Sequence, residues 1–147
     1  MVSIDKILNK IGNNYLCPVV AIIRRNKILI GLRNYTADKW KEISVWTLPG
    51  GRYDEGEAIE TTLRREVAEE VGIRDLAISQ FLGIVPGAKE GDQVYIFKAT
   101  TSREPILMEP EKFSEWRWVP LSKIPENFIN EAALKLIKKK TKKAIDK

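Results

Sequence analysis

The 147-residue sequence contains no histidine and only one cysteine, Cys17. Without histidine there is no Ser-His-Asp triad, no histidine-ligated zinc and no histidine general base, so acid–base chemistry must use carboxylates, lysine, tyrosine or metal-bound water. A single cysteine excludes an internal disulfide and suits a reducing compartment. Cys17 stands beside Pro18 at the start of an apolar run. We therefore predict that it is a buried structural thiol and not a nucleophile.

Long apolar runs are also missing. The longest, around residues 17–23, is far too short to span a bilayer, and the N-terminus lacks the continuous apolar stretch of a secretory signal. We therefore expect a cytoplasmic protein with no membrane partner. The length suits a single domain over residues 1–147 with a core of its own.

Positive charge gathers at the C-terminus, where the net charge of +5 is concentrated in a run of lysines between residues 135 and 143. We interpret this run as the solvated face and end of a last helix. The alternative is attraction of a polyanion, either a nucleotide or a nucleic acid. Aromatic side chains do not interrupt the lysines, which weakens the nucleic-acid alternative.

The periodicity of apolar residues predicts a mixed α/β domain. Helices are expected within residues 1–12, from about 57 to 71, and from 131 to 143 in a basic segment that continues to 147. Strands are expected at 19–23 and 28–32, joined as a hairpin, and within 40–48, 76–85, 93–101 and 114–120. The second helix should bury a stripe formed by Ile59, Leu63, Val67 and Val71 and end at Gly72.

Glu66, Glu69 and Glu70 share one face of this second helix, because they stand at positions i, i+3 and i+4. Like charges so close repel, so we expect a cation to neutralise them. Carboxylates without a thiol or imidazole suit Mg²⁺ or Mn²⁺ better than zinc or copper. Arg65 stands four residues before Glu69 and can pair with it, and Gly50–Gly51 permits close approach of the backbone to a ligand. The alternative is an exposed helix with ordinary surface ion pairs.

The complete spacing over residues 51–73 is more specific than the acidic face alone. The segment reads glycine, five residues, glutamate, seven residues, then Arg-Glu-aliphatic-any-Glu-Glu-any-Gly-aliphatic. It matches the Nudix box at every defined position, so the chain resembles the Nudix hydrolases, and among them the MutT-like members. The resemblance implies an α/β/α sandwich on a mixed sheet, with the box as a loop–helix–loop. It also implies hydrolysis of a nucleoside diphosphate linked to another group, X.

The same resemblance implies roles for residues of the box. Glu66, Glu69 and Glu70 would ligate the metal and act in catalysis together with Arg65, which would orient the acids. The Gly50 carbonyl would contribute to one site, and Glu57 would lie in or just behind the metal shell. Mg²⁺ is the expected cofactor, with Mn²⁺ as a substitute. It would bridge phosphate oxygens and activate a water whose proton a glutamate removes for in-line attack at phosphorus. Glu66 is the favoured base, although members of the family differ in this role.

Residues 109–125 are similar to Nudix enzymes that cleave nucleoside triphosphates, which favours a (d)NTP as substrate, with (d)NMP and pyrophosphate as products. For part of this segment a structural role is equally open, since Trp116 and Trp118 can fill one side of a strand that Pro120 ends. Two other classes also stay open: a Nudix enzyme acting on ADP-ribose, nucleotide sugars, dinucleoside polyphosphates or an RNA cap, and a catalytically silent nucleotide-binding module. The resemblance is compatible with a homodimer.

Residues that would contact the substrate are indicated only by their type. A nucleobase needs an aromatic or aliphatic platform and one or two hydrogen-bonding partners. For each base-contact candidate the alternative is a place in the core or at a helix cap. The candidates are Trp46, Tyr95 and Phe128 as platforms, Asn127 and Asn130 as hydrogen-bonding partners, Arg33 as a further contact, and Glu109 or Glu111 as an additional carboxylate.

Overall fold

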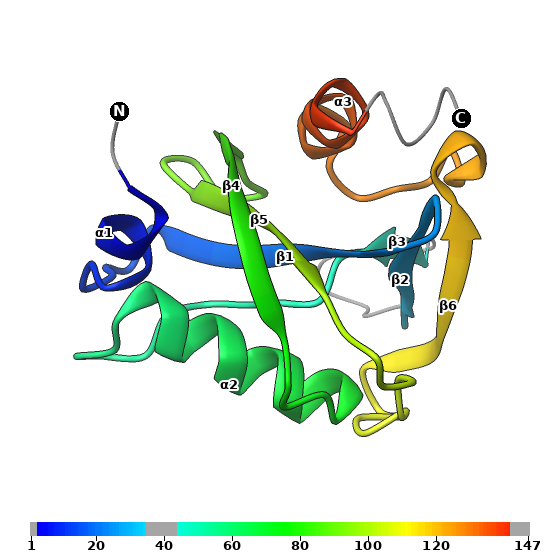
Figure 1. The fold of residues 1–147 in the computed structure, drawn as a ribbon, viewed down its shortest axis with the longest axis horizontal. Helices are drawn as coiled ribbons and strands as arrows, with labels where there is room; N and C mark the ends of the chain where they lie inside the picture. The colour runs from blue at the N-terminus through cyan, green and yellow to red at the C-terminus, as the bar shows by residue number, and fades with distance from the viewer. Residues whose placement is uncertain (1–2, 35–43, 142–147) are drawn as a thin grey trace.

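A computed structural model describes residues 3–34 and 44–141 of the chain (Figure 1). The first residues of the predicted N-terminal helix, residues 40–43 of the predicted third strand and the basic end from 142 onward lie outside the described residues. The elements are α1 Ile4–Leu8, β1 Leu16–Arg24, β2 Lys27–Arg33, β3 Val45–Thr47, α2 Ile59–Val71, β4 Ala77–Pro86, β5 Gln93–Thr100, β6 Phe113–Pro120, the 3₁₀ turn η1 Leu121–Lys123 and α3 Glu131–Lys140.

The strands form a mixed sheet in the order β3-β2-β1-β5-β4, with β6 paired to the other edge of β2. Strands β1 and β5 are parallel, and the other paired strands are antiparallel. The predicted hairpin between β1 and β2 is confirmed, and its turn places Arg25 and Asn26 at positive φ. Asn26 suits such a turn because its short polar side chain tolerates the left-handed region.

Strand β2 leaves β1 soon after the hairpin, and this divergence positions the site. The two strands pair only where Ile23 meets Ile28 and Arg24 meets Lys27. Farther along β1 the chain around Gly50 takes the place of β2, through a bridge between Val19 and Gly50. The loop that precedes α2 is therefore fixed to the middle of the sheet.

Helices cover both faces of this sheet, and Figure 1 shows α2 (green) and α3 (orange-red) on opposite sides of the strands. One buried apolar cluster joins α1 and α2 to the sheet, and a second joins α3 to its other face. The predicted stripe on α2 is confirmed, since its members are fully buried: Ile59, Leu63, Val67 and Val71. The predicted α/β/α sandwich is therefore confirmed.

The structure corrects the sequence-based helix boundaries. Helix α1 ends at Leu8, before the predicted end near Gly12, and α3 ends at Lys140, before the predicted 143. Helix α2 begins at Ile59 rather than near 57, because Ala58 is extended and its carbonyl accepts the first helical hydrogen bond, from the Thr62 amide. Glu57 therefore belongs to the loop before the helix. Gly72 ends α2 in the left-handed region, with φ of 70°, as predicted.

The last described helix, α3, begins with Asn130, whose side chain accepts a hydrogen bond from the Ala133 amide. Its final turn carries the exposed residues Lys138, Lys139 and Lys140, whose positive charges interact favourably with the negative end of the helix dipole. The interpretation of the basic run as a solvated helix end therefore fits its described part. Among the residues described, helices are too short or too polar to cross a membrane.

Candidate active site

Because glycine has no side chain, Gly50 and Gly51 let the loop before α2 lie against both β1 and Glu66. Gly50 has φ of 140°, and a side chain there would collide with the Pro18 carbonyl of β1. A Cβ atom on Gly51 would lie 2.5 Å from a carboxylate oxygen of Glu66. The turn is therefore held between the sheet on one side and the acidic face of α2 on the other.

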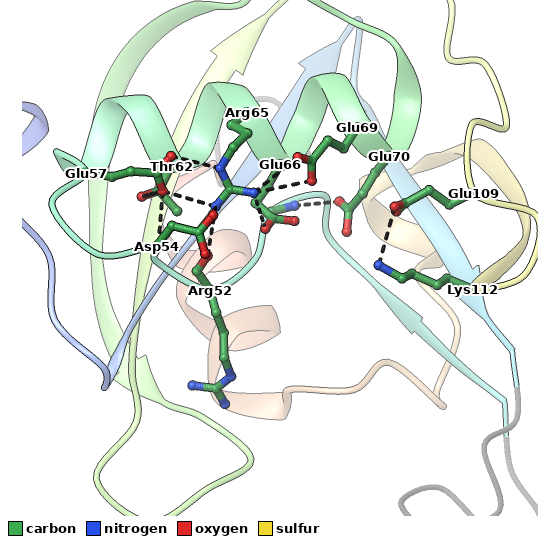
Figure 2. Close-up of polar contacts among 11 residues, drawn as sticks. Arg52, Asp54, Glu57, Thr62, Arg65, Glu66, Glu69, Glu70, Glu109 and Lys112 are labelled. Carbon is green, nitrogen blue, oxygen red and sulfur yellow. Dashed lines mark hydrogen bonds and ion pairs between the residues drawn. The ribbon is translucent and has the colours of Figure 1, made fainter.

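Arg65 organises the acidic face from its N-terminal end (Figure 2). Its guanidinium donates to both oxygens of Glu57, at 2.8 and 3.0 Å. The hydrogen bonds from Arg65 hold the pKa of Glu57 at about 2, with help from the Asp54 amide and the Thr62 hydroxyl. Glu57 is thus ionised, and both of its oxygens already accept hydrogen bonds within the protein.

The same guanidinium also binds carboxylates within the helix. It donates to Glu66 at 3.0 Å and to Glu69 at 3.3 Å, and to the Arg52 carbonyl at 3.2 Å. The predicted pair between Arg65 and Glu69 is present, although Glu57 is the nearer partner. These contacts raise the pKa of Arg65 above its ordinary value, mainly through Glu57.

Glu66 and Glu70 also line a cleft in the surface of the protein. Glu70 is buried, and its Oε1 accepts a hydrogen bond from the Gly50 amide at 2.9 Å. Burial raises the pKa of Glu70 to about 8, and the charges of Glu66 and Glu109 act in the same direction. Burial likewise raises the pKa of Glu66, against the influence of Arg65. Both carboxylates would therefore gain from a cation.

The donor chemistry of this site fits a hard divalent ion. Buried Glu70 and partly buried Glu66 offer carboxylate oxygens beside Gly50, and neither a thiol nor an imidazole accompanies them on α2. Glu69 is half-exposed and paired with Arg65. Within residues 3–34 and 44–141, three acidic or cysteine side chains do not come close enough, as placed, to enclose an ion.

The cleft has a volume of about 710 Å³ and runs from the acidic pair to the start of α3. That size is within the range of small-molecule sites. Besides Glu66 and Glu70, its walls come from separate parts of the chain: Cys17 and Val19 on β1, Arg33 on β2, Thr47 on β3, Leu48, Gly50, Gly51 and Arg52 before α2, Pro86 at the end of β4 with Gly87 and Ala88 after it, Asp92 and Val94, Lys112 and Phe113, and Phe128, Ile129, Asn130, Glu131 and Ala133.

Some of the predicted substrate contacts lie in the cleft. Arg33 lines it near the acidic pair and lowers the pKa of Glu70, in opposition to the larger effect of burial. Phe128 and Asn130 line the opposite part. Asn130 also caps α3, and its side-chain amide donates a hydrogen bond to the Pro86 carbonyl at 2.8 Å.

Three other predicted contacts lie outside the cleft, where they pack in the core or bind the backbone. Trp46 is buried in the α3-side cluster beneath the Arg117 guanidinium. Tyr95 is buried in the opposite cluster, against Phe81. Asn127 donates to the Ser44 carbonyl. The cleft lining includes none of these three candidates.

The predicted contact at Glu111 also falls outside the cleft, where its side chain is exposed. The adjacent Lys112 lines the cleft instead. Glu109 is close enough to raise the pKa of Glu70, although burial contributes more. Trp116 and Trp118 pack against the α2-side cluster from one side of β6, as their spacing indicated.

Cys17 is part of the cleft wall and is only partly buried, where a buried thiol was predicted. Burial of the sulfur atom nevertheless raises the pKa of the thiol to about 11. The thiol is therefore protonated near neutral pH, which agrees with a structural role.

An ion pair between Arg52 and Asp92 joins two walls of the cleft and was not predicted. The guanidinium donates to both carboxylate oxygens, at 3.1 and 2.8 Å, and the Lys89 amide donates to Asp92 at 3.0 Å. The Arg52 hydrogen bonds lower the pKa of Asp92. Gly87 lies against the Asp92 side chain, where a Cβ atom would have to displace it.

We expect Asp92→Asn to destabilise the protein by about 1–2 kcal/mol near neutral pH, because Arg52 loses the buried carboxylate that accepts its two hydrogen bonds. The folded-state pKa lies below the ordinary value of 3.8, so this stabilisation is present above that value and lost as the pH falls through the folded-state pKa. Urea unfolding of both proteins at about pH 7 and about pH 3 should show a difference that shrinks in acid. The exposed Glu90 in the same loop provides the control, since Glu90→Gln should have almost no effect at either pH. A difference that grows in acid would contradict this assignment.

A mixed sheet between two helical layers, with an acidic helix entered from a double-glycine turn, has the architecture of the Nudix fold. Comparison with protein families matches residues 17–140 to the NUDIX domain. The chain therefore belongs to the Nudix hydrolase family.

Known proteins of this family resemble the chain in sequence and in structure. It is 30% identical over 87 residues to a putative 8-oxo-dGTP diphosphatase of Bacillus subtilis, covering 59% of this chain and 58% of that protein. It is 32% identical over 132 residues to the NAD-capped RNA hydrolase NudC of Mannheimia succiniciproducens, covering 82% of this chain and 49% of that protein. The chain thus spans only about half to three-fifths of these two relatives.

A solved MutT Nudix hydrolase of Burkholderia pseudomallei has a TM-score of 0.62 and 25% identity, covering 92% of this chain and 98% of that one. A Nudix hydrolase of Nitrosomonas europaea has a TM-score of 0.73 and 18% identity, covering 90% and 72%.

Proposed function

We propose that the protein is a metal-dependent pyrophosphohydrolase that cleaves a nucleoside diphosphate derivative, with a (d)NTP as the preferred substrate and (d)NMP and pyrophosphate as products. The observation that carries this proposal is the pair Glu66 and Glu70, two carboxylates facing a large cleft where burial disfavours their ionised forms. Such a pair is costly unless a cation or proton neutralises it.

In the proposed site, Glu66, Glu69 and Glu70 and the Gly50 carbonyl would hold Mg²⁺, and Mn²⁺ would serve in its place. The metal would supply charge neutralisation at the phosphate oxygens and activation of water. The protein would position the metal ligands: the Gly50 amide holds Glu70 through a hydrogen bond, and Arg65 orients Glu66. Glu66 is our candidate to accept the proton from the attacking water, through its carboxylate.

The preference for a triphosphate rests on two kinds of support. The relative from Bacillus subtilis is named as a putative 8-oxo-dGTP diphosphatase. The cleft also offers Arg33 and Lys112 close to the acidic pair, where a phosphate chain would need cationic partners. Phe128 offers an aromatic ring farther along the same cleft.

A second candidate function is cleavage of the pyrophosphate bond within a dinucleotide or an ADP-ribose-like molecule. The relative named as an NAD-capped RNA hydrolase matches more of this chain, 82%, than the diphosphatase relative does, 59%. A substrate with two nucleoside-like ends would also use both ends of a cleft of about 710 Å³.

A substrate panel with Mg²⁺ tests these candidates directly. The panel should contain (d)NTPs, oxidised nucleotides, ADP-ribose, nucleotide sugars and dinucleoside polyphosphates. We expect pyrophosphate release from at least one (d)NTP, and its complete loss when EDTA removes the metal. Faster turnover of ADP-ribose or a dinucleoside polyphosphate would favour the second candidate, and no turnover anywhere would favour a binding module.

A cytoplasmic location, a single domain over residues 1–147 and a homodimer are further parts of the proposal. A lone cysteine with a protonated, partly buried thiol is compatible with a reducing compartment. Light scattering of the purified protein would decide between monomer and dimer.

A further inference from the structure

Three cationic side chains line the described part of the cleft, and they differ in how free they are to meet a ligand. Arg52 is held in a two-bond ion pair with the buried Asp92. Arg33 lies with its guanidinium 5.7 Å from the centre of the Phe113 ring. Among the residues that the structure describes, Lys112 pairs with Glu109 alone, at 3.3 Å.

The backbone of Lys112 is firmly placed, although its side chain is half-exposed. The Lys112 amide donates to the Glu109 carbonyl at 2.9 Å, and its carbonyl accepts from the Asn34 amide at 2.8 Å. The Asn34 side chain donates to the Pro110 carbonyl at 3.0 Å. A fixed backbone with a long, mobile ammonium group suits a residue that must reach a ligand.

The ammonium group lies at the end of the acidic face opposite Arg65. Figure 2 shows Lys112 extending toward Glu70 and Glu109, whereas Arg65 reaches Glu57 and Glu66. The charge of Lys112 also acts on Glu66, whose pKa it lowers slightly against the larger effect of burial. Lys112 therefore lies within electrostatic reach of the carboxylates proposed to hold the metal.

A phosphate chain held at these carboxylates by a divalent ion would retain charged oxygens. The Lys112 side chain is 53% exposed, whereas that of Glu109 is 20% exposed. Because an ammonium group has three donor hydrogens, Lys112 can bind a phosphate oxygen and keep Glu109 as a partner. Arg65 and Arg52 are less available, since both are committed to carboxylate oxygens. Lys112 and Arg33 are the cleft cations that can meet a phosphate chain, and Arg33 already stacks on the Phe113 ring.

We propose that Lys112 binds an oxygen of the substrate's phosphate chain and thereby selects substrates in which group X is itself phosphate over those in which X is a sugar. This inference rests on the proposed function. The selection follows from charge, because a nucleoside triphosphate carries more negative charge beyond its first phosphate than a nucleotide sugar does, and an ammonium group acts as a point charge.

Steady-state kinetics of Lys112→Met, measured with a (d)NTP, tests the proposal. We expect KM to rise by about tenfold, because a charge-assisted contact present in both ground and transition states is lost, while kcat changes by less than about threefold. Lys112→Arg should keep KM within about threefold of wild type. Lys123→Met removes an equal charge from an exposed position outside the cleft and should leave KM unchanged.

Binding measurements separate phosphate selection from a general loss of structure. By calorimetry, Lys112→Met should bind a triphosphate analogue with a methylene bridge about tenfold more weakly, and a nucleotide sugar less than about threefold more weakly. Equal weakening of both ligands, or an unchanged KM for the (d)NTP, would overturn the role of Lys112 and leave the proposed function standing. A wild-type protein that hydrolyses no member of the substrate panel would overturn the proposed function itself.

Discussion

Glu70→Gln is expected to lower metal-dependent pyrophosphate release by about 10³-fold or more, while the fold remains intact. Glutamine keeps the shape of the side chain and an oxygen that can accept the hydrogen bond from the Gly50 amide at 2.9 Å. It loses the negative charge that would bind the metal. Initial rates with a (d)NTP and Mg²⁺ measure the loss.

The same substitution should leave the stability of the metal-free protein unchanged or slightly higher. Burial raises the pKa of Glu70 to about 8, so ionisation of this carboxyl group opposes folding as the pH rises from its ordinary value of 4.5 toward 8. A neutral amide removes that opposition. Urea unfolding near neutral pH would therefore separate loss of activity from loss of structure.

Glu66→Gln should also reduce the rate by orders of magnitude, on the order of 10²-fold or more, since Glu66 lies in the same cleft. The matched control is Glu60→Gln on the same helix, because Glu60 pairs with Arg64 at 2.8 Å and does not line the cleft. That control should keep wild-type rates. If Glu66→Gln and Glu70→Gln both keep wild-type rates, the site is assigned wrongly.

Arg65→Ala is expected to lower stability and activity together. The guanidinium binds Glu57, Glu66 and Glu69, and its removal would leave these carboxylates facing one another. Because Arg65 is only partly exposed, we expect a loss of about 2–3 kcal/mol in the free energy of unfolding, reduced from the fully buried case by solvent screening. Activity should fall by about 10²-fold as Glu66 loses its orientation. Urea unfolding and initial rates measure the two effects.

Two comparisons make the role of Arg65 specific. Arg65→Lys should recover little, because lysine cannot reproduce the two hydrogen bonds to Glu57. Added Mg²⁺ should restore more stability to Arg65→Ala than it adds to wild type, since the cation would neutralise the exposed carboxylates. If Arg65→Ala kept wild-type stability and rate, Arg65 would not be needed to hold the carboxylates of the acidic face in place.

The sequence could predict those parts of the structure that show a regular spacing of similar residues along the chain. The buried stripe of α2 follows from helical spacing, and the left-handed end at Gly72 follows from the freedom of glycine. The acidic face of Glu66 and Glu70 follows from the same spacing. Burial of Glu70 against Gly50 does not, because it depends on how the double-glycine turn enters beside β1.

Contacts between distant segments could not be read from the chain. Arg52 and Asp92 stand 40 positions apart in different loops, and neither belongs to a periodic pattern. In the turn before β6, residue type favoured Glu111, but the turn geometry directs Lys112 into the cleft and leaves Glu111 exposed. Trp46 has the ring expected of a base platform, yet the bridge between its strand and Phe128 places it in the core.

Phosphorus NMR of a (d)NTP incubated with the protein and Mg²⁺ tests the central claim most directly, because it identifies the products as well as the turnover. The account predicts signals of (d)NMP and pyrophosphate with the wild-type protein, and their absence with Glu70→Gln or after EDTA. Orthophosphate with a nucleoside diphosphate as the products, or equal product formation by Glu70→Gln, would contradict it.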